Sequence, residues 1–350
     1  MSSLTFLYRW LFVAKARQHS KGFTLLELLI SLVVASIVVS TLLYMVVELA
    51  KIDKREAILD QIQRDMKRAM EYITDDLQEA VYVYPNPERI ATELASDPSF
   101  PGRSGEVPIL AFWRIDPIED GFPSCGDIPN PTTERQGQCN ALKIRQASYT
   151  LVVYSQKVNN ANRNWPGQSR IVRYELSQYK NVSTLEARRG YRDPTNSTDP
   201  LAPFERWQVN TNGAPEGFSA VLVDYVQTPD SPIAFSRAPL SDADGAGVSA
   251  PCFRYGTGGV PARPLYTVLP STATTTKNNS FFACVRNPDP DNDPNTTTRT
   301  NQDIYVFLRG SVQGTSGGVN FFSQASSLPI LETRVLVKGV INKDLADDGS

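Results

Sequence analysis

One carboxylate, Glu27, lies just inside a long apolar stretch near the start of this 350-residue chain. Leu28 to Val47 contains no charged residue, and the nearest charge before Glu27 is Lys21. A helix of about 20 residues rises about 30 Å, which matches the hydrocarbon core of a bilayer. An unpaired carboxylate at that depth costs at least ~2.5 kcal/mol on insertion scales. The chemistry expected of Glu27 is therefore ionic pairing with a cation that another group supplies.

The residues that precede the apolar stretch predict its orientation. Four cations come before it and no acid does: Arg9, Lys15, Arg17 and Lys21. By the positive-inside rule the N-terminus stays in the cytoplasm and the bulk of the chain lies outside. A secretory signal peptide is the alternative, but it needs small residues in an A-x-A pattern after the apolar core. The segment Val46–Lys51 offers no such site.

The run Lys21-Gly22-Phe23-Thr24-Leu25-Leu26-Glu27 resembles the processing site of type IV prepilins and type II secretion pseudopilins. The resemblance implies that a prepilin peptidase cuts after Gly22 and that the new first residue, Phe23, is N-methylated. It also implies that Glu27 contacts the N-terminus of a neighbouring subunit in a filament. An ordinary signal anchor with a chance glutamate remains the alternative interpretation.

The apolar helix is expected to continue beyond the membrane. Apolar residues recur at spacings of mostly three and four, the period of one helical stripe: Ile52, Leu59, Ile62, Met66, Ala69, Met70, Ile73, Leu77 and Ala80. Pro85 and Pro87 are expected to end this helix. The segment 63–77, which ends in Asp75-Asp76-Leu77, resembles the helix of J-type minor pseudopilins and W-type minor pilins. The expected domains are a leader at 1–22, a stem helix at 23–84 that spans the membrane over 23–47, and a head at 85–350.

The head is expected to be rich in strands, because its many prolines exclude long helices and its apolar runs are short. Candidate strands are Val107–Arg114, Ser148–Lys157, Ile171–Gln178, Ala220–Val226, Phe281–Arg286, Ile304–Leu308 and Leu331–Val337. Long polar loops are expected at Pro117–Gly137, Gln156–Ser169, Arg188–Pro203 and Pro239–Pro251. The predicted fold is α+β and pilin-like. A long N-terminal helix, half membrane-spanning and half amphipathic, packs on an antiparallel sheet.

The four cysteines, Cys125, Cys139, Cys252 and Cys284, all lie beyond the membrane segment, where oxidation is permitted. Three connectivities are open to four cysteines. The pairs Cys125–Cys139 and Cys252–Cys284 are favoured, because each closes a local, loop-rich stretch. Neither pair has the C-x-x-C spacing of a metal or redox site.

Catalytic motifs are weak in this sequence. The single histidine, His19, lies in the leader, so a mature chain would lack the base of a Ser–His–Asp site and every histidine metal ligand. Residues 314–318 fit the G-x-S-x-G pattern, but without a histidine they are interpreted as a turn. No enzyme is expected. An anchored hydrolase with two carboxylates has no motif behind it.

Two features of the head could bind a ligand. Asp289, Asp291 and Asp293 alternate in a polar loop, and clustered carboxylates suit calcium. Pro294 departs from the EF-hand pattern, and no other cofactor is expected. Trp113, Trp165 and Trp207 could stack on sugars, although aromatic residues of a β-rich domain more often belong to the core. Trp165, in a polar run, is the one most expected to be exposed. The mild net charge of −2 without a basic stripe indicates no nucleic-acid partner.

The expected function is that of a minor pilin or pseudopilin in a type IV pilus or a type II secretion-like pseudopilus, which supports protein or polysaccharide secretion or motility. The resemblance extends to pseudopilins of cyanobacterial polysaccharide-secretion systems. It implies a single-pass protein of the inner membrane with a periplasmic head, which then enters a filament. The implied partners are the prepilin peptidase, other pilins or pseudopilins and an inner-membrane assembly platform. The alternative is a membrane-anchored binding or adhesion protein that never polymerises.

Overall fold

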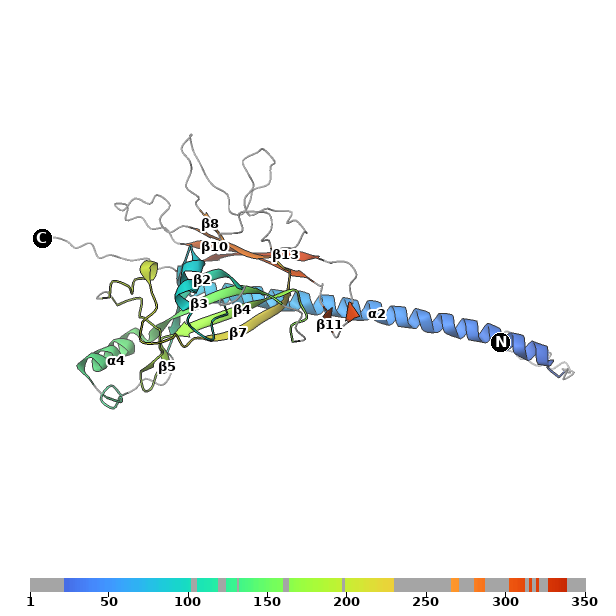
Figure 1. Ribbon diagram of the computed structural model, residues 1–350, viewed down its shortest axis with the longest axis horizontal. Coiled ribbons are helices and arrows are strands. Elements are labelled where there is room, and N and C mark those ends of the chain that lie inside the picture. The colour runs from blue at the N-terminus through green and yellow to red at the C-terminus, as the bar shows by residue number, and fades with distance from the viewer. Residues whose placement is uncertain are drawn as a thin grey trace, which may run out of the picture. The chain divides into compact units, whose positions relative to one another are not determined.

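Helix α2 (Leu25–Gln78) is the longest element of the computed structural model (Figure 1). The structure describes residues 22–101, 106–118, 124–130, 132–159, 164–196, 199–229, 266–270, 280–286, 302–311, 315–316, 319–320 and 327–338. By its internal contacts the chain divides into two units, Met1–Ile58 and Leu59–Ser350, and α2 contributes to both.

The C-terminal end of α2 differs from the expected one. The helix ends at Gln78, well before Pro85, because Ala80–Val83 forms strand β1, which is buried at every position. Pro87 begins a helix instead of ending one: it opens α3 (Pro87–Leu94). A proline is tolerated in the first helical turn, where its missing N–H would have no partner. The Asn86 side chain caps α3 by accepting the Arg89 N–H at 3.2 Å.

The head contains a sheet whose pairings are all antiparallel. Its first part has the order β1-β2-β3-β4-β7, with β2 (Glu106–Pro117), β3 (Ala147–Val158), β4 (Ser169–Ser177) and β7 (Phe218–Val226). Its second part has β10 (Asp303–Ser311) paired with β9 (Phe281–Arg286) and β13 (Ser327–Leu336), and β8 (Tyr266–Leu269) beside β9. The parts join through one residue pair, Val226 and Gly310. The expected α+β fold is confirmed, and each expected strand lies within or close to an observed one.

Opposite faces of the first part of the sheet have different partners. One face carries an aromatic core in which Trp113, Trp207 and Tyr174 pack with Ile90 and Leu94 of α3. The other face packs against the part of α2 that follows Ile58, which we call the head portion of α2. Its buried residues include Ile62, Met66, Met70, Ile73 and Leu77. A Cβ at Gly310 would lie 3.2 Å from Met66 Cγ and 2.8 Å from a Leu328 methyl, so this glycine allows β10 to approach α2 closely.

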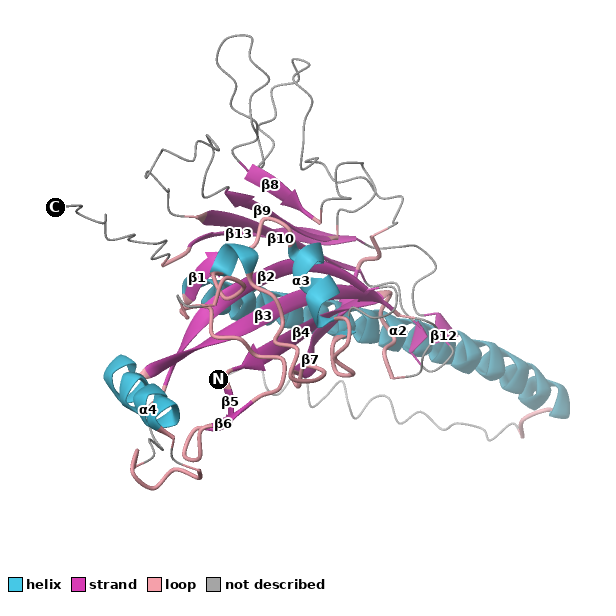
Figure 2. Ribbon diagram, turned by 60° about the vertical axis from the view of Figure 1, so that its left-hand side comes forward, coloured by secondary structure: helices cyan, strands magenta, loops and turns pink. Residues whose placement is uncertain are grey.

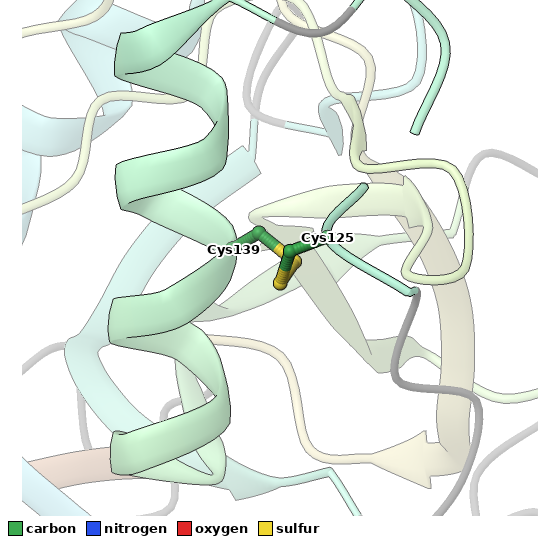
Figure 3. Close-up of a disulfide and its surroundings, with 2 residues drawn as sticks. All are labelled: Cys125 and Cys139. Carbon is green, nitrogen blue, oxygen red and sulfur yellow. A yellow bond between two sulfur atoms is a disulfide. The ribbon is translucent and has the colours of Figure 1, made fainter. Parts of the chain in front are cut away.

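A small disulfide-linked cluster lies beside the sheet. Helix α4 (Thr133–Arg145) begins inside the stretch expected to be a loop, and the Thr132 side chain caps it by accepting the Arg135 N–H at 3.2 Å. Cys139 of α4 is bonded to Cys125, as expected (Figure 3). Ile128, Leu142 and Leu185 complete the buried cluster. Short strands complete the described elements: β5 (Tyr179–Asn181) with β6 (Glu186–Ala187), and β11 (Thr315–Ser316) with β12 (Val319–Asn320), together with the 3-10 helix η2 (Phe204–Arg206).

Candidate functional site

The start of α2 is fixed by a local capping interaction. The Glu27 N–H donates to Thr24 Oγ1 at 3.3 Å, and the Leu28 N–H donates to the Thr24 carbonyl at 3.2 Å. Thr24 is thus the N-cap, and Glu27 stands three residues later, where a carboxylate is favoured by the helix dipole. The spacing Thr24-x-x-Glu27 is that of a capping box. The sequence interpretation overlooked this role of Thr24, although the threonine–glutamate spacing could have revealed it.

Gly22 and Phe23 precede the helix in irregular backbone. Phe23 is 80% exposed, and a Cβ added at Gly22 would meet no atom of the described residues within 4 Å. Packing against the described residues therefore gives no reason for a glycine at position 22.

The aliphatic hydroxyls of the apolar segment are satisfied within the helix. Ser31 donates to the Leu28 carbonyl at 2.9 Å, Ser36 to Val33 at 2.8 Å, and Ser40 to Ser36 at 2.7 Å. Thr41 donates to the Ile37 carbonyl at 2.7 Å. Such bonds to the preceding turn remove the penalty of a bare hydroxyl in an apolar medium. With their hydroxyl groups bonded to the helix backbone, these side chains are compatible with lipid or with a helix bundle.

Glu27 differs from those hydroxyls, because no described residue donates a hydrogen bond or supplies a cation to its exposed carboxylate. By contrast, Glu48, further along the exposed helix, lies 3.3 Å from the Lys51 ammonium. Within the described chain, α2 is the one helix long and apolar enough to cross a membrane, and its most apolar window is fully exposed. Glu27 thus places an uncompensated charge at the beginning of a membrane-compatible helix.

Near its C-terminal end, α2 carries a buried carboxylate, Asp76, that is paired with several groups. Asp76, which is 4% exposed, accepts from Arg114 Nη1 at 2.6 Å, from the Tyr154 hydroxyl at 2.6 Å and from Arg173 Nε at 2.7 Å. Burial raises the pKa of Tyr154 well above its ordinary value, and Asp76 raises it further, so this hydroxyl remains a neutral donor. Three adjacent strands therefore hold α2 through one side chain. Asp75, beside it in the sequence, is exposed.

The remaining expected ligand sites fall mostly outside the described residues. Asp289, Asp291 and Asp293 lie there, as does Cys252, so calcium binding and the Cys252–Cys284 pair stay predictions. Cys284 is buried in β9. The described residues contain no group of three or more His, Cys, Asp or Glu side chains placed to hold a metal. Trp165 is half-buried, and the Arg170 guanidinium lies 5.2 Å from the centre of its ring.

Comparison with known proteins gives one match. Residues 17–43 match the prokaryotic N-terminal methylation motif, a segment that contains Gly22, Phe23 and Glu27. Neither curated proteins nor solved structures gave a match to this chain. The match coincides with the start of α2, where the exposed apolar helix and the uncompensated Glu27 lie. This motif lies at the N-terminal end of a long, exposed, apolar helix. It supports assigning the chain to the type IV prepilin and pseudopilin family.

Proposed function

We propose that this protein is a minor pilin or pseudopilin subunit whose function is assembly into a filament. The prepilin peptidase cuts after Gly22, Phe23 becomes the methylated N-terminus, and α2 anchors the chain in the inner membrane with the head in the periplasm. An assembly platform then draws the subunit into a filament with other pilins or pseudopilins. The filament serves secretion or motility. The large β-rich head supports a minor role.

The observation that carries this proposal is the contrast between Glu27 and its neighbours on α2. The hydroxyls at 31, 36, 40 and 41 are satisfied by the helix backbone, whereas the Glu27 carboxylate has no partner among the described residues. Moving such a helix from lipid into a bundle of similar helices keeps its apolar contacts. It also lets Glu27 pair with the amino group of Phe23 on an adjacent subunit. Each carboxylate is satisfied only when the stems are correctly staggered, so the pair selects the register.

Substitution of Glu27→Leu tests this mechanism. Membrane insertion should persist, because a charge is removed from lipid, and processing should persist because Gly22 is unchanged. Incorporation into sheared filaments should fall at least about tenfold, since truncating one partner of a buried, hydrogen-bonded charge pair costs about 2–5 kcal/mol. The matched control is Glu48→Leu, which removes a glutamate that is already paired with Lys51 on the same helix. Normal incorporation of the Glu27 variant would favour a non-polymerising membrane anchor.

Mass spectrometry of the mature N-terminus tests the processing step separately. We expect a peptide that begins with methylated Phe23. Gly22→Arg should leave the precursor uncut, because a bulky cation replaces a hydrogen where the peptidase approaches the backbone. An intact leader in filament fractions of the natural sequence would contradict the cleavage assignment.

A further inference from the structure

A groove of about 400 Å³ lies in the head between α2 and β7. Ile62, Arg68 and Tyr72 line it from α2, residues 221–225 line it from β7, and Trp165 also contributes. Five consecutive residues of β7 therefore contribute to its wall. The assembly role proposed for Glu27 does not use this groove.

Along most of its length, the edge of β7 that borders the groove has no paired strand among the described residues. On one side β7 pairs with β4 from Phe218 to Val226. Its other described pairing is the single contact between Val226 and Gly310. Figure 2 shows β7 at the margin of the first part of the sheet. Residues 218–225 therefore present backbone N–H and C=O groups to which, among the described residues, no further strand is paired. An edge of this kind is a template for an added strand.

The connection between β3 and β4 contacts the C-terminal end of β7 and fixes its backbone conformation there. The β4–β7 register is irregular near Leu222 and again near Tyr225, whose φ is +61°. The Asp224 carboxylate accepts from Asn159 Nδ2 at 2.7 Å and from the Gly167 N–H at 3.0 Å. A Cβ at Gly167 would lie 2.4 Å from the Tyr225 nitrogen, so only glycine permits this approach. Irregular pairing of this kind changes the direction of side chains along a strand, and it occurs here near Leu222 and Tyr225, which both line the groove.

Most polar side chains of the groove already make hydrogen bonds within the chain. Both oxygens of Asp224 accept hydrogen bonds, and the Asp65 carboxylate accepts from Gln61 at 2.9 and 3.0 Å. Arg170 lies over the ring of Trp165, which limits stacking there. Arg68 is exposed and has no ion-pair or hydrogen-bond partner in the described part of the chain. A sugar would need many free hydrogen-bonding side chains, whereas an extended peptide can use the backbone of β7.

We propose that this groove binds an extended polypeptide segment of a partner protein, which adds to β7 as a further strand. Its aliphatic side chains would lie against Ile62, Leu222 and Tyr225, and an acidic side chain would face Arg68. Main-chain hydrogen bonds supply affinity in this mode of recognition, and the side-chain contacts supply specificity. The partner is therefore defined by an alternating aliphatic sequence with an acid at one position.

Fluorescence anisotropy on the full-length protein in detergent tests this assignment. The probes are acetylated seven-residue peptides of alternating valine and threonine with a central glutamate or lysine. The glutamate peptide should bind at least about tenfold more tightly than the lysine peptide, and Arg68→Glu should reverse that preference. N-methylation of alternate amides should abolish binding, because it removes the donors of one strand edge. Amide exchange in residues 218–225 should slow in the complex.

The matched control is Arg64→Glu, on an exposed arginine of the same helix that does not line the groove. It should keep the preference of the natural protein. Absence of peptide binding, or equal binding of the N-methylated peptide, would overturn the proposal. Binding of cellohexaose that Leu222→Glu abolishes, without peptide binding, would also overturn it and would identify a sugar site. None of these outcomes depends on filament assembly, so this proposal and the function of Glu27 can fail separately.

Discussion

Asp76 and Glu27 are carboxylates of one helix, but among the described residues only Asp76 has hydrogen-bond partners for its side chain. Asp76 is buried under two guanidinium groups and a tyrosine hydroxyl. Glu27 is exposed, and its carboxylate has no described partner. The apolar residues of the same helix divide in the same way: Met66 is 2% exposed and Met45 is 70% exposed. The C-terminal portion of α2 is thus buried by the rest of the fold, whereas the described residues leave its N-terminal portion exposed.

This difference indicates how each portion should respond to mutation. A charge that is compensated inside the fold contributes to the stability of the fold. A charge left for an external partner contributes to assembly and adds little to folding. Stability measurements on the full-length protein in detergent, with matched variants on α2, can therefore separate the two portions.

The largest expected effect is that of Asp76→Asn. The substitution removes the buried counter-charge that Arg114 and Arg173 share, although Arg114 keeps Asp116 and Arg173 keeps Glu175 as partners. Removal of one member of a buried ion pair costs about 3–5 kcal/mol. Chemical denaturation of the head should show this loss in the free energy of unfolding. The neighbouring exposed variant Asp75→Asn should change it by less than about 0.5 kcal/mol. Equal effects of the two variants would refute the role assigned to Asp76.

The next effect compares two methionines of α2. Met66→Ala should lower the free energy of unfolding by about 2–5 kcal/mol, because it opens a cavity between α2 and β10. Met45→Ala should leave it within about 0.5 kcal/mol, because the Met45 side chain is exposed. If both substitutions cost the same, the N-terminal portion of α2 must be packed within the protein after all.

The smallest effect concerns a carboxylate at the surface of the head. A hydrogen bond from Lys180, together with Arg189, lowers the pKa of Glu216 to about 2. Because the folded pKa lies below the unfolded value, this carboxylate stabilises the fold above about pH 4.5, and the contribution is lost as the pH falls toward 2. Glu216→Gln should lower the melting temperature slightly at pH 7. The difference from the natural protein should narrow on acidification and in high salt. A difference that persists unchanged at low pH would show that charge is not its cause.

The sequence predicted some secondary elements well and others poorly, for identifiable reasons. The strand at 281–286 was expected at its observed bounds, because its apolar residues form a compact run. The end of α2 was misplaced, because Ala80 fits the helical stripe as well as it fits β1. Helix α4 was missed, because it presents a weak apolar face and is packed through the disulfide cluster. The capping pair at Thr24 and Glu27 could have been found from its spacing alone.

The processing segment needed only the sequence, because its chemistry depends on local order: a basic leader, a glycine and one acid in an apolar run. The roles of Asp76 and of the β7 groove required the tertiary structure. The partners of Asp76 lie 38, 78 and 97 residues further along the chain. The edge of β7 is defined by which strands pair with it, a consequence of topology that no periodicity encodes. Local signals specify a helix and its cap, whereas long-range packing decides which of its charges the fold itself compensates.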